Sequence, residues 1–199
     1  MDNSIKNILI AGVGGQGVLL ASELLSEVAI ISGLDVKKSE VHGMSQRGGV
    51  VTSHVRIGRK VYSPIIPYGR ADIILSFEQA EGLGALDWLA PEGKIIVSST
   101  ILVPPSANLG KLKYPDDPIA EIKKKTDNVI AVDADRMARD LGNIRLVNTI
   151  LLAVGSPFIG FERSVWEEAI KKLVKPQYVD INLTAFAQGC ELANSKAGV

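Results

Sequence analysis

Short runs rich in aliphatic residues alternate with amphipathic stretches along the first two thirds of the chain. The runs at residues 5–11, 72–77, 94–98 and 129–132 predict buried strands, and residues 36–41 predict another strand. An apolar stripe at intervals of three or four residues predicts a helix over residues 16–32; its members are Val18, Ala21, Leu25, Val28 and Ala29. Strands that alternate with helices favour a layered α/β fold with helices on both faces of one sheet.

One segment departs from this alternation of strands and helices. Residues 50–57 are rich in β-branched side chains, Gly58-Arg59 can turn, and residues 60–66 are predicted to return as a second strand. Because the two strands of a hairpin are antiparallel, we expect a mixed sheet. Further helices are predicted over residues 78–89, 119–125 and 134–141, and residues 100–118, which contain four prolines, are predicted to be irregular.

The last third of the chain predicts helices only. A helix over residues 146–154 is expected to end near Gly155 and Pro157, Ser164 and Glu167 have the spacing of a capping box at the start of the next helix, and a final helix covers residues 179–193. We therefore predict one domain over residues 1–199. It is a three-layer, Rossmann-like α/β domain with a mostly parallel but mixed sheet, one antiparallel hairpin, all strands within residues 1–135 and a helical part over residues 136–199.

The composition narrows the classes of partner. Of the 199 residues 46% are hydrophobic, and 22 basic residues balance 22 acidic ones, so we expect neither nucleic acid nor a membrane as a partner. The single cysteine, Cys190, excludes a disulfide framework and an intrachain thiolate cluster, and it is predicted to lie in the core. The N-terminus lacks a signal-peptide pattern, and no apolar run approaches about 20 residues, so a cytoplasmic location is expected.

The first candidate site is the loop between the first predicted strand and the first predicted helix. Its glycines at positions 12, 14 and 17 fit the G-x-G-x-x-G spacing, which predicts a cradle for phosphate on the N–H groups around Gly14 to Gly17. The alternative is that the glycines only permit a tight turn with close packing. A dinucleotide site would also need an acid about 20 residues further on, and Glu40 is the candidate.

A second glycine-rich loop, residues 42–49, follows the predicted strand at 36–41. Arg47 could pair with phosphate or carboxylate, and Gly48-Gly49 would let the backbone approach closely, whereas the alternative is a solvated connection with a local salt bridge. Both glycine loops are predicted to lie at strand ends. His42 and His54 are the only histidines, which excludes a multi-histidine metal site, and His54 is predicted to be structural.

Several catalytic motifs are missing from the sequence. It contains no G-x-x-x-x-G-K-[ST], C-x-x-C, H-E-x-x-H or G-x-S-x-G pattern. A loop that is suited to bind phosphate, in a chain without catalytic motifs, indicates that the chain is part of a larger enzyme.

The two glycine motifs, in this order, resemble the gamma-type subunits of 2-oxoacid:ferredoxin oxidoreductases. The form His-Gly-Met-Ser-Gln-Arg-Gly-Gly at residues 42–49 is most similar to the beta subunit of the indolepyruvate-oxidising branch, and the resemblance extends to residues 70–78 and 182–186. The resemblance implies that the cofactor-binding candidates are Gly12, Gly14, Gly15, Gln16, Gly17, Gln46, Arg47, Gly48 and Gly49.

The resemblance also implies a chemistry. The family oxidatively decarboxylates 2-oxoacids with thiamine diphosphate, passes electrons through iron–sulfur clusters to ferredoxin and forms acyl-CoA. It implies that a large partner subunit holds thiamine diphosphate and the clusters, while this chain carries no catalytic residue and no metal. The chain is then the non-thiamine subunit of an enzyme for aromatic, indolepyruvate-like 2-oxoacids. It is inactive alone and helps to shape a shared CoA or substrate region.

Two other functions stay open at the level of the sequence. One is a free-standing Rossmann-type oxidoreductase that binds a dinucleotide, supported by the glycine spacing and Glu40. The other is a non-catalytic assembly module whose loops contact only a partner. Homodimer formation by the isolated chain is also left open.

Overall fold

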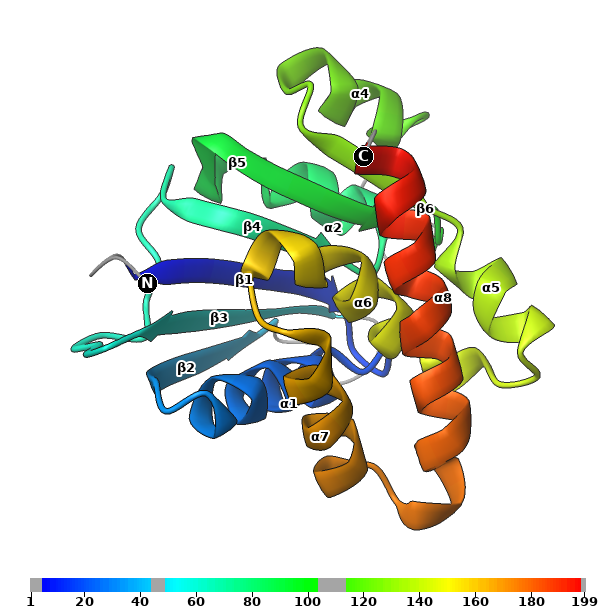
Figure 1. Ribbon diagram of the computed structural model, residues 1–199. Helices are drawn as coiled ribbons and strands as arrows, with labels where there is room; N and C mark the ends of the chain where they lie inside the picture. The colour runs from blue at the N-terminus through cyan, green and yellow to red at the C-terminus, as the bar shows by residue number, and fades with distance from the viewer. Residues whose placement is uncertain (1–4, 44–48, 104–113, 198–199) are drawn as a thin grey trace.

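A six-stranded sheet forms the centre of the computed structural model, which describes residues 5–43, 49–103 and 114–197 (Figure 1). The strands follow the order β2-β3-β1-β4-β5-β6. Their bounds are β1 Lys6–Val13, β2 Asp35–His42, β3 Val50–Gly58, β4 Ala71–Ser76, β5 Leu89–Ser98 and β6 Val129–Val132. Strand β3 is antiparallel to both β1 and β2, whereas β1, β4, β5 and β6 are parallel, so β2 runs in the same direction as β1.

Helices cover both faces of this sheet, which gives three layers. Helices α1 and α6 pack on one face, α2 and α4 pack on the other, and α7 and α8 pack outside α1 and α6 (Figure 1). The α-helices are α1 Val18–Ile31, α2 Gln79–Gly84, α4 Pro118–Lys125, α5 Ala134–Asp140, α6 Val147–Ile159, α7 Arg163–Leu173 and α8 Val179–Ala197, and the short 3-10 turns are Leu86–Trp88, Ile144–Leu146 and Pro176–Tyr178. The predicted α/β architecture, mixed sheet and helical C-terminal part are confirmed.

The position of β1 at the centre of the sheet explains why its residues 8–11 are all apolar. Ile8 and Ile10 belong to the core cluster on the α1 and α6 side, whereas Leu9 and Ala11 belong to the cluster on the opposite face. All four are at most 1% exposed. A strand that is covered on both faces has no solvent-facing positions, so polar residues do not alternate along it.

The predicted hairpin was placed wrongly. Residues 60–66 form no strand, and the antiparallel neighbours of β3 are β1 and β2. Side chains of β3 hold the segment that follows it: Arg56 donates to the Ser63 and Ile65 carbonyls, and the Ile66 N–H donates to Nδ1 of His54. The segment also contains Pro64, which cannot donate to a ladder.

Helix α6 continues through Gly155 and Pro157, where the sequence predicted its end. Pro157 cannot donate to the Ala153 carbonyl, but the Ser156 hydroxyl donates to that oxygen instead at 2.8 Å. The helix ends at Gly160, whose φ of 92° is left-handed.

The next two helices also differ from their predicted bounds. Helix α7 begins at Arg163 after Glu162, so the predicted capping box at Ser164 is wrong, and Glu167 pairs with Arg163 Nε at 2.7 Å instead. Helix α8 extends to Ala197, beyond the predicted end at residue 193.

A buried carboxylate, that of Glu78, joins Leu102 and Tyr114, which follow β5 in the chain, to the start of α2. Glu78 is 1% exposed, and its Oε2 accepts the Glu81 N–H while its Oε1 accepts the Leu102 N–H and the Tyr114 hydroxyl. Burial, together with the Glu78 carboxylate, raises the pKa of Glu81 to about 7. Glu81 is therefore a partly buried acid whose charged form is disfavoured in the folded protein.

Replacing Glu81 by glutamine should remove a pH-dependent loss of stability. A raised pKa means that the folded protein binds this proton more tightly than the unfolded chain does. Its contribution to stability is complete below about pH 4.5 and is lost as the pH rises through about 7. At about pH 8, Glu81→Gln should raise the free energy of unfolding by on the order of 1–3 kcal/mol, with little change at pH 4.5.

Urea unfolding at the two pH values measures this difference. The matched control is Glu168→Gln, which makes the same change at an exposed helical position. An equal pH dependence for Glu81→Gln and the wild-type protein would contradict the assignment.

Candidate functional site

The two glycine loops meet at one edge of the sheet. Strands β1 and β2 end there and β3 begins there, because Val13 pairs with Val50 and His42 pairs with Val51. The Gly14 N–H donates to the Gly49 carbonyl at 3.0 Å. The prediction that both loops lie at strand ends is confirmed, and the structure adds that they are in direct contact.

The side chain of Gln16 holds the first loop together. Its Oε1 accepts the N–H of Val13 at 2.7 Å, and its Nε2 donates to the carbonyl of Phe77 at 2.9 Å. The backbone N–H of Gln16 closes the turn by donating to the backbone carbonyl of Val13 at 3.1 Å. Both polar atoms of this side chain are therefore engaged within the fold, linking the end of β1 to the residue after β4.

Three of the loop glycines meet local structural requirements. A Cβ atom at Gly12 would lie 2.9 Å from Cγ2 of Val18 and 3.0 Å from Cβ of Phe77, so this position requires close packing. Gly15 and Gly17 have φ angles of 99° and 88°, which other residues rarely adopt. The tight-turn interpretation thus accounts for these three glycines without a ligand.

The start of α1 nevertheless leaves donors available. Its N-cap is Gly17, which has no side chain to cap the helix, and the first turn contains no acidic residue. The Ala21 N–H is the first to bond back, to the Gly17 carbonyl, so the N–H groups of Val18, Leu19 and Leu20 have no acceptor among the described residues. Such a helix start attracts anions.

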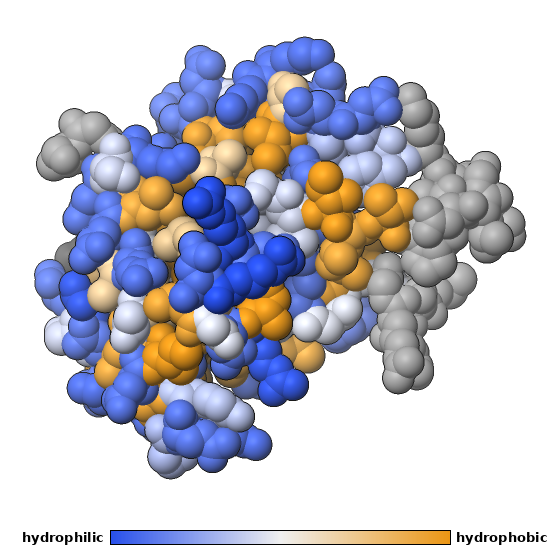
Figure 2. Space-filling view, turned by 90° about the vertical axis from the view of Figure 1, so that its right-hand side faces the viewer, coloured by the Kyte–Doolittle hydropathy of each residue, from blue (hydrophilic) through white to orange (hydrophobic). Residues whose placement is uncertain are grey.

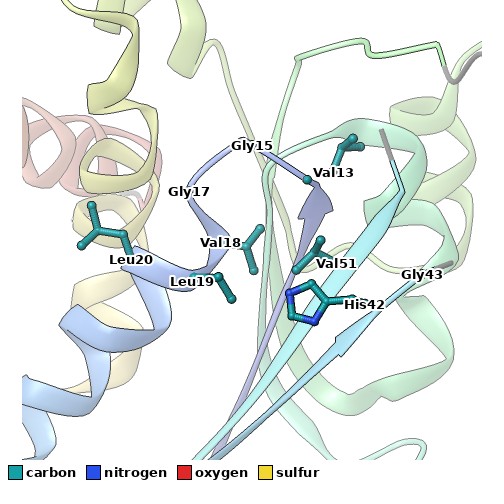
Figure 3. Close-up of a pocket in the computed structure, with 10 residues that line it drawn as sticks. Val13, Gly15, Gly17, Val18, Leu19, Leu20, His42, Gly43 and Val51 are labelled. Carbon is teal, nitrogen blue, oxygen red and sulfur yellow. The ribbon is translucent and has the colours of Figure 1, made fainter. Parts of the chain in front are cut away.

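A cavity of about 590 Å³ opens between the two loops. Figure 3 shows the His42 ring, from β2, beside Val51 and facing the start of α1 at Val18 and Leu19. Apart from His42, all the side chains that line it are aliphatic; the full lining is Val13, Gly14, Gly15, Gly17, Val18, Leu19, Leu20, His42, Gly43 and Val51. The cavity therefore combines backbone donors with an apolar wall.

A second cavity, of about 380 Å³, lies on the other side of the glycine loop. Gly15, Gly17 and Leu20 line both cavities, so the loop and the start of α1 form a shared wall. Apart from Gln16 of the loop itself, the remaining residues come from distant parts of the chain; they are Thr100, Leu102, Asp135, Ile144, Arg145, Val147 and Asn148. Arg145 and Asn148 could not be predicted from the sequence, because no motif or spacing connects them to the loop.

Three predicted site residues, Gln46, Arg47 and Gly48, lie outside the described residues. Glu40 does not line either cavity; it pairs with Lys38 at 3.2 Å and lies 3.5 Å from the Ser22 hydroxyl. Strand β3 separates β2 from β1, which places Glu40 two strand spacings, about 10 Å, from the strand that leads into the glycine loop. Glu40 is therefore poorly placed for the ribose of a dinucleotide on that loop.

The other singled-out residues are structural. His54 is 5% exposed, accepts the Ile66 N–H, and burial lowers the pKa of its imidazole. Cys190 is half-buried, its Sγ lies 3.7 Å from the Ser156 hydroxyl, and burial raises the pKa of its thiol. Within the described ranges, no three His, Cys, Asp or Glu side chains gather as a metal site, and no helix could span a membrane.

Exposed aliphatic side chains surround the cavities. Figure 2 shows the side toward which β1 points in Figure 1, where apolar surface gathers between hydrophilic groups. The large exposed side chains that lie on the cavity walls, or at residues 101–103 beside them, are 38% to 58% exposed; they are Leu19, Leu20, Ile101, Leu102, Val103 and Ile144. Apolar surface of this kind around a cavity is typical of an interaction site.

Comparison with known proteins gives matches over nearly the whole chain. The sequence model described as "Pyruvate ferredoxin/flavodoxin oxidoreductase" matches residues 7–192. The chain is 38% identical over 202 residues to the indolepyruvate oxidoreductase subunit IorB of Thermococcus kodakarensis, covering 97% of this chain and 98% of the relative. It is 39% identical over 196 residues to IorB of Archaeoglobus fulgidus, covering 95% and 96%.

Other relatives contain this unit within a longer chain. The ketoisovalerate oxidoreductase subunit VorA of Methanothermobacter thermautotrophicus is 28% identical, and the match covers 94% of this chain but 36% of VorA. Two solved structures share the fold. The gamma subunit of the keto/oxoacid ferredoxin oxidoreductase of Geobacter sulfurreducens has a TM-score of 0.71 at 22% identity, covering 96% and 99%. The 2-oxoglutarate:ferredoxin oxidoreductase of Magnetococcus marinus has a TM-score of 0.75 at 18% identity, covering 98% of this chain and 32% of that one.

Changing Gln16 to glutamate should destabilise the protein. A carboxylate oxygen would then face the Phe77 carbonyl, where Nε2 now donates, at a cost of about 1–3 kcal/mol in the free energy of unfolding. A negative charge near the start of α1 would return only about 0.3–1 kcal/mol. Urea unfolding measures the difference, with Gln188→Glu on the exposed side of α8 as the matched control. Equal losses in the two variants would show that the Gln16 bridge does not stabilise the fold.

Proposed function

Because this chain belongs to the pyruvate ferredoxin/flavodoxin oxidoreductase family, we propose that it is the non-thiamine subunit of an aromatic 2-oxoacid oxidoreductase. The complex would oxidatively decarboxylate indolepyruvate-like 2-oxoacids to acyl-CoA and reduce ferredoxin. The observation that carries this proposal is the match to two IorB subunits at 38% and 39% identity over at least 95% of this chain. We assign no catalytic residue to the chain, and we expect it to be inactive alone.

The residues of this chain do not fit the redox cofactors of such a complex. An iron–sulfur cluster is commonly held by four cysteine thiolates, and the chain has one cysteine. We therefore place the clusters on a large partner subunit. Thiamine diphosphate belongs there as well in our proposal, because the sequence contains no thiamine-binding signature. The role left to this chain is to bind, orient and enclose.

Coenzyme A fits the shared edge better than those cofactors do. Its phosphates are anions, and the N–H groups at the start of α1 are donors that the described part of the fold leaves without acceptors. In this proposal Gly15 and Gly17 let the backbone approach the ligand, and Arg47, two residues before Gly49, supplies positive charge. Gln16 acts indirectly, because its side chain holds the loop in place.

The exposed aliphatic side chains around the cavities are the proposed contact with the large subunit. Six large apolar side chains on one side of a protein would be in contact with water unless a partner covered them. The comparisons support a partner here, since the same unit occupies about a third of longer chains in VorA and in the Magnetococcus enzyme. A segment that is fused in some relatives is expected to pack against the rest of the enzyme when it is a separate chain.

A purely structural role for the glycine loops is the second candidate. It is favoured by Gly12 and Gln16, whose packing and hydrogen bonds have a complete explanation within the fold. In that case the loops would serve only assembly, and the isolated chain and the complex would bind no ligand at this edge.

An aspartate at Leu19 should block assembly while leaving the isolated chain folded. Leu19 is 41% exposed at the start of α1, where a negative charge is stabilising by about 0.3–1 kcal/mol. In an apolar interface the same carboxylate would be desolvated at a cost of several kcal/mol. When Leu19→Asp is co-expressed with the large thiamine- and cluster-binding subunit of the same organism, co-purification should fall by about tenfold or more.

The control for this experiment is Tyr62→Asp, an 87%-exposed position in the segment after β3, at the opposite edge of the sheet. That variant should co-purify like the wild-type chain. Unchanged co-purification of Leu19→Asp would remove this surface from the interface.

A further inference from the structure

The second cavity is lined by an amide side chain that the fold orients through its oxygen, while its nitrogen faces the cavity without a partner among the described residues. Asn148, in the first turn of α6, is 3% exposed. Its Oδ1 accepts the N–H of Thr149 at 2.8 Å. Its Nδ2 has no acceptor among the described residues, and it lies 3.2 Å from the point that a Cβ atom would occupy at Gly17. The wholly buried side-chain atoms that lack a partner among the described residues are Ser53 Oγ and Trp166 Nε1. Nδ2 of Asn148 is therefore open to the cavity that Asn148 lines, where a ligand can accept its hydrogen bond.

A chain of hydrogen bonds supports this orientation. Asn182 of α8 donates from Nδ2 to the Tyr178 carbonyl at 2.8 Å, which leaves its Oδ1 facing α6. The Thr149 hydroxyl donates to that Oδ1 at 2.6 Å. Thr149 is thus held by α8, and its backbone N–H in turn holds Oδ1 of Asn148, so the Asn148 donor points away from the network. Asn182 belongs to the segment at residues 182–186 that carries part of the family resemblance.

Two helix starts face the same cavity. Gly17 and Leu20 from α1 and Val147 and Asn148 from α6 line it, and neither helix has an acidic residue in its first turn. The positive ends of both helix dipoles therefore point toward one small volume.

The charged side chains on the wall determine where in the cavity an anion would bind. Arg145 lines it from the turn before α6 and is exposed, and the structure gives its side chain no partner among the described residues. Asp135, from the first turn of α5, lines the same cavity and would repel an anion. An anion would therefore sit on the side of Gly17 and Asn148, and Thr100 offers a further hydroxyl on the wall.

We propose that this second cavity is an oxyanion-binding subsite in which Nδ2 of Asn148 donates to a phosphate or carboxylate oxygen, between the starts of α1 and α6. Gly17 is required there because any side chain would stand between the oxyanion and Nδ2. Thr149 and Asn182 are positioning residues, since they act through Asn148. The subsite deepens the proposed function, on which the identity of the natural ligand rests: the oxyanion would belong to a phosphate-bearing cofactor or to an acidic side chain of the partner.

The test uses the full chain without its partner and inorganic phosphate as the probe. Phosphate binding is followed by the broadening of its ³¹P resonance on titration with protein. Asn148→Asp keeps the acceptor for the Thr149 N–H but replaces the donor by a negative charge, so phosphate affinity should fall by about tenfold or more. Asp135→Asn should have the opposite effect and raise the affinity for phosphate by about twofold to fivefold, because it removes a negative charge from the cavity wall.

The matched control is Asn128→Asp, before β6 at the opposite edge of the sheet, which makes the same charge change away from the cavity. It should bind phosphate like the wild-type chain. Circular dichroism and thermal unfolding establish that all variants are folded, and an aspartate in the first turn of α6 is itself favourable.

Acetate competition distinguishes the two sources of the oxyanion. Weak displacement of phosphate by acetate assigns the subsite to a phosphoryl group, and equal displacement assigns it to a carboxylate. The proposal is overturned if phosphate and acetate show no protein-dependent binding, or if Asn148→Asp and Asn128→Asp bind alike. The phosphate experiment contains no partner subunit, so a negative result would not bear on the proposed assembly with the large subunit. Conversely, a failure of the chain to co-purify with that subunit would not bear on phosphate binding by the isolated chain.

Discussion

The geometry of the glycine-loop edge depends on the two hydrogen bonds of one side chain amide. Gln16 joins the last N–H of β1 to the carbonyl that follows β4, and these are the two central parallel strands of the sheet. The bridge determines where the loop turns and therefore where α1 begins. Because Gly15, Gly17 and Leu20 form the wall between the two cavities, the shape of both depends on this bridge. The close packing of Gly12 against Phe77 supports the same junction.

Much of the fold could be predicted because burial on both faces makes the central part of a strand apolar, as at residues 8–11 of β1, 73–75 of β4 and 95–97 of β5. The errors occurred where long-range contacts override local signals. The segment at residues 60–66 contains β-branched residues, yet its backbone groups bond to the side chains of Arg56 and His54 instead of to a neighbouring strand. Pro157 indicates a helix end, yet the Ser156 hydroxyl satisfies the carbonyl that the proline leaves free. Neither effect leaves a periodic pattern in the sequence.

Only part of the candidate site could be predicted from the sequence, because the rest of it also depends on long-range contacts. Both glycine loops have recognisable spacings, and their placement at strand ends follows from the direction of the strands. Asn148 and Arg145 have no motif, and only the crossing of α6 beside the start of α1 brings them to the loop. Asn182, in the segment at residues 182–186, likewise bonds to Thr149 of α6 and lines neither cavity. Residues that act through a neighbour in space are invisible to spacing rules.

We propose above that the chain works as one subunit of an enzyme that oxidises aromatic 2-oxoacids. The most direct test is to isolate the tagged chain anaerobically from its native cells and to measure CoA-dependent reduction of ferredoxin by the purified material. Indolepyruvate, pyruvate and 2-oxoglutarate should be compared as substrates. The account predicts recovery of a large, cysteine-rich, thiamine-dependent partner and the highest rate with indolepyruvate. Recovery of the chain alone, or reduction of ferredoxin with pyruvate or 2-oxoglutarate but not with indolepyruvate, would contradict it.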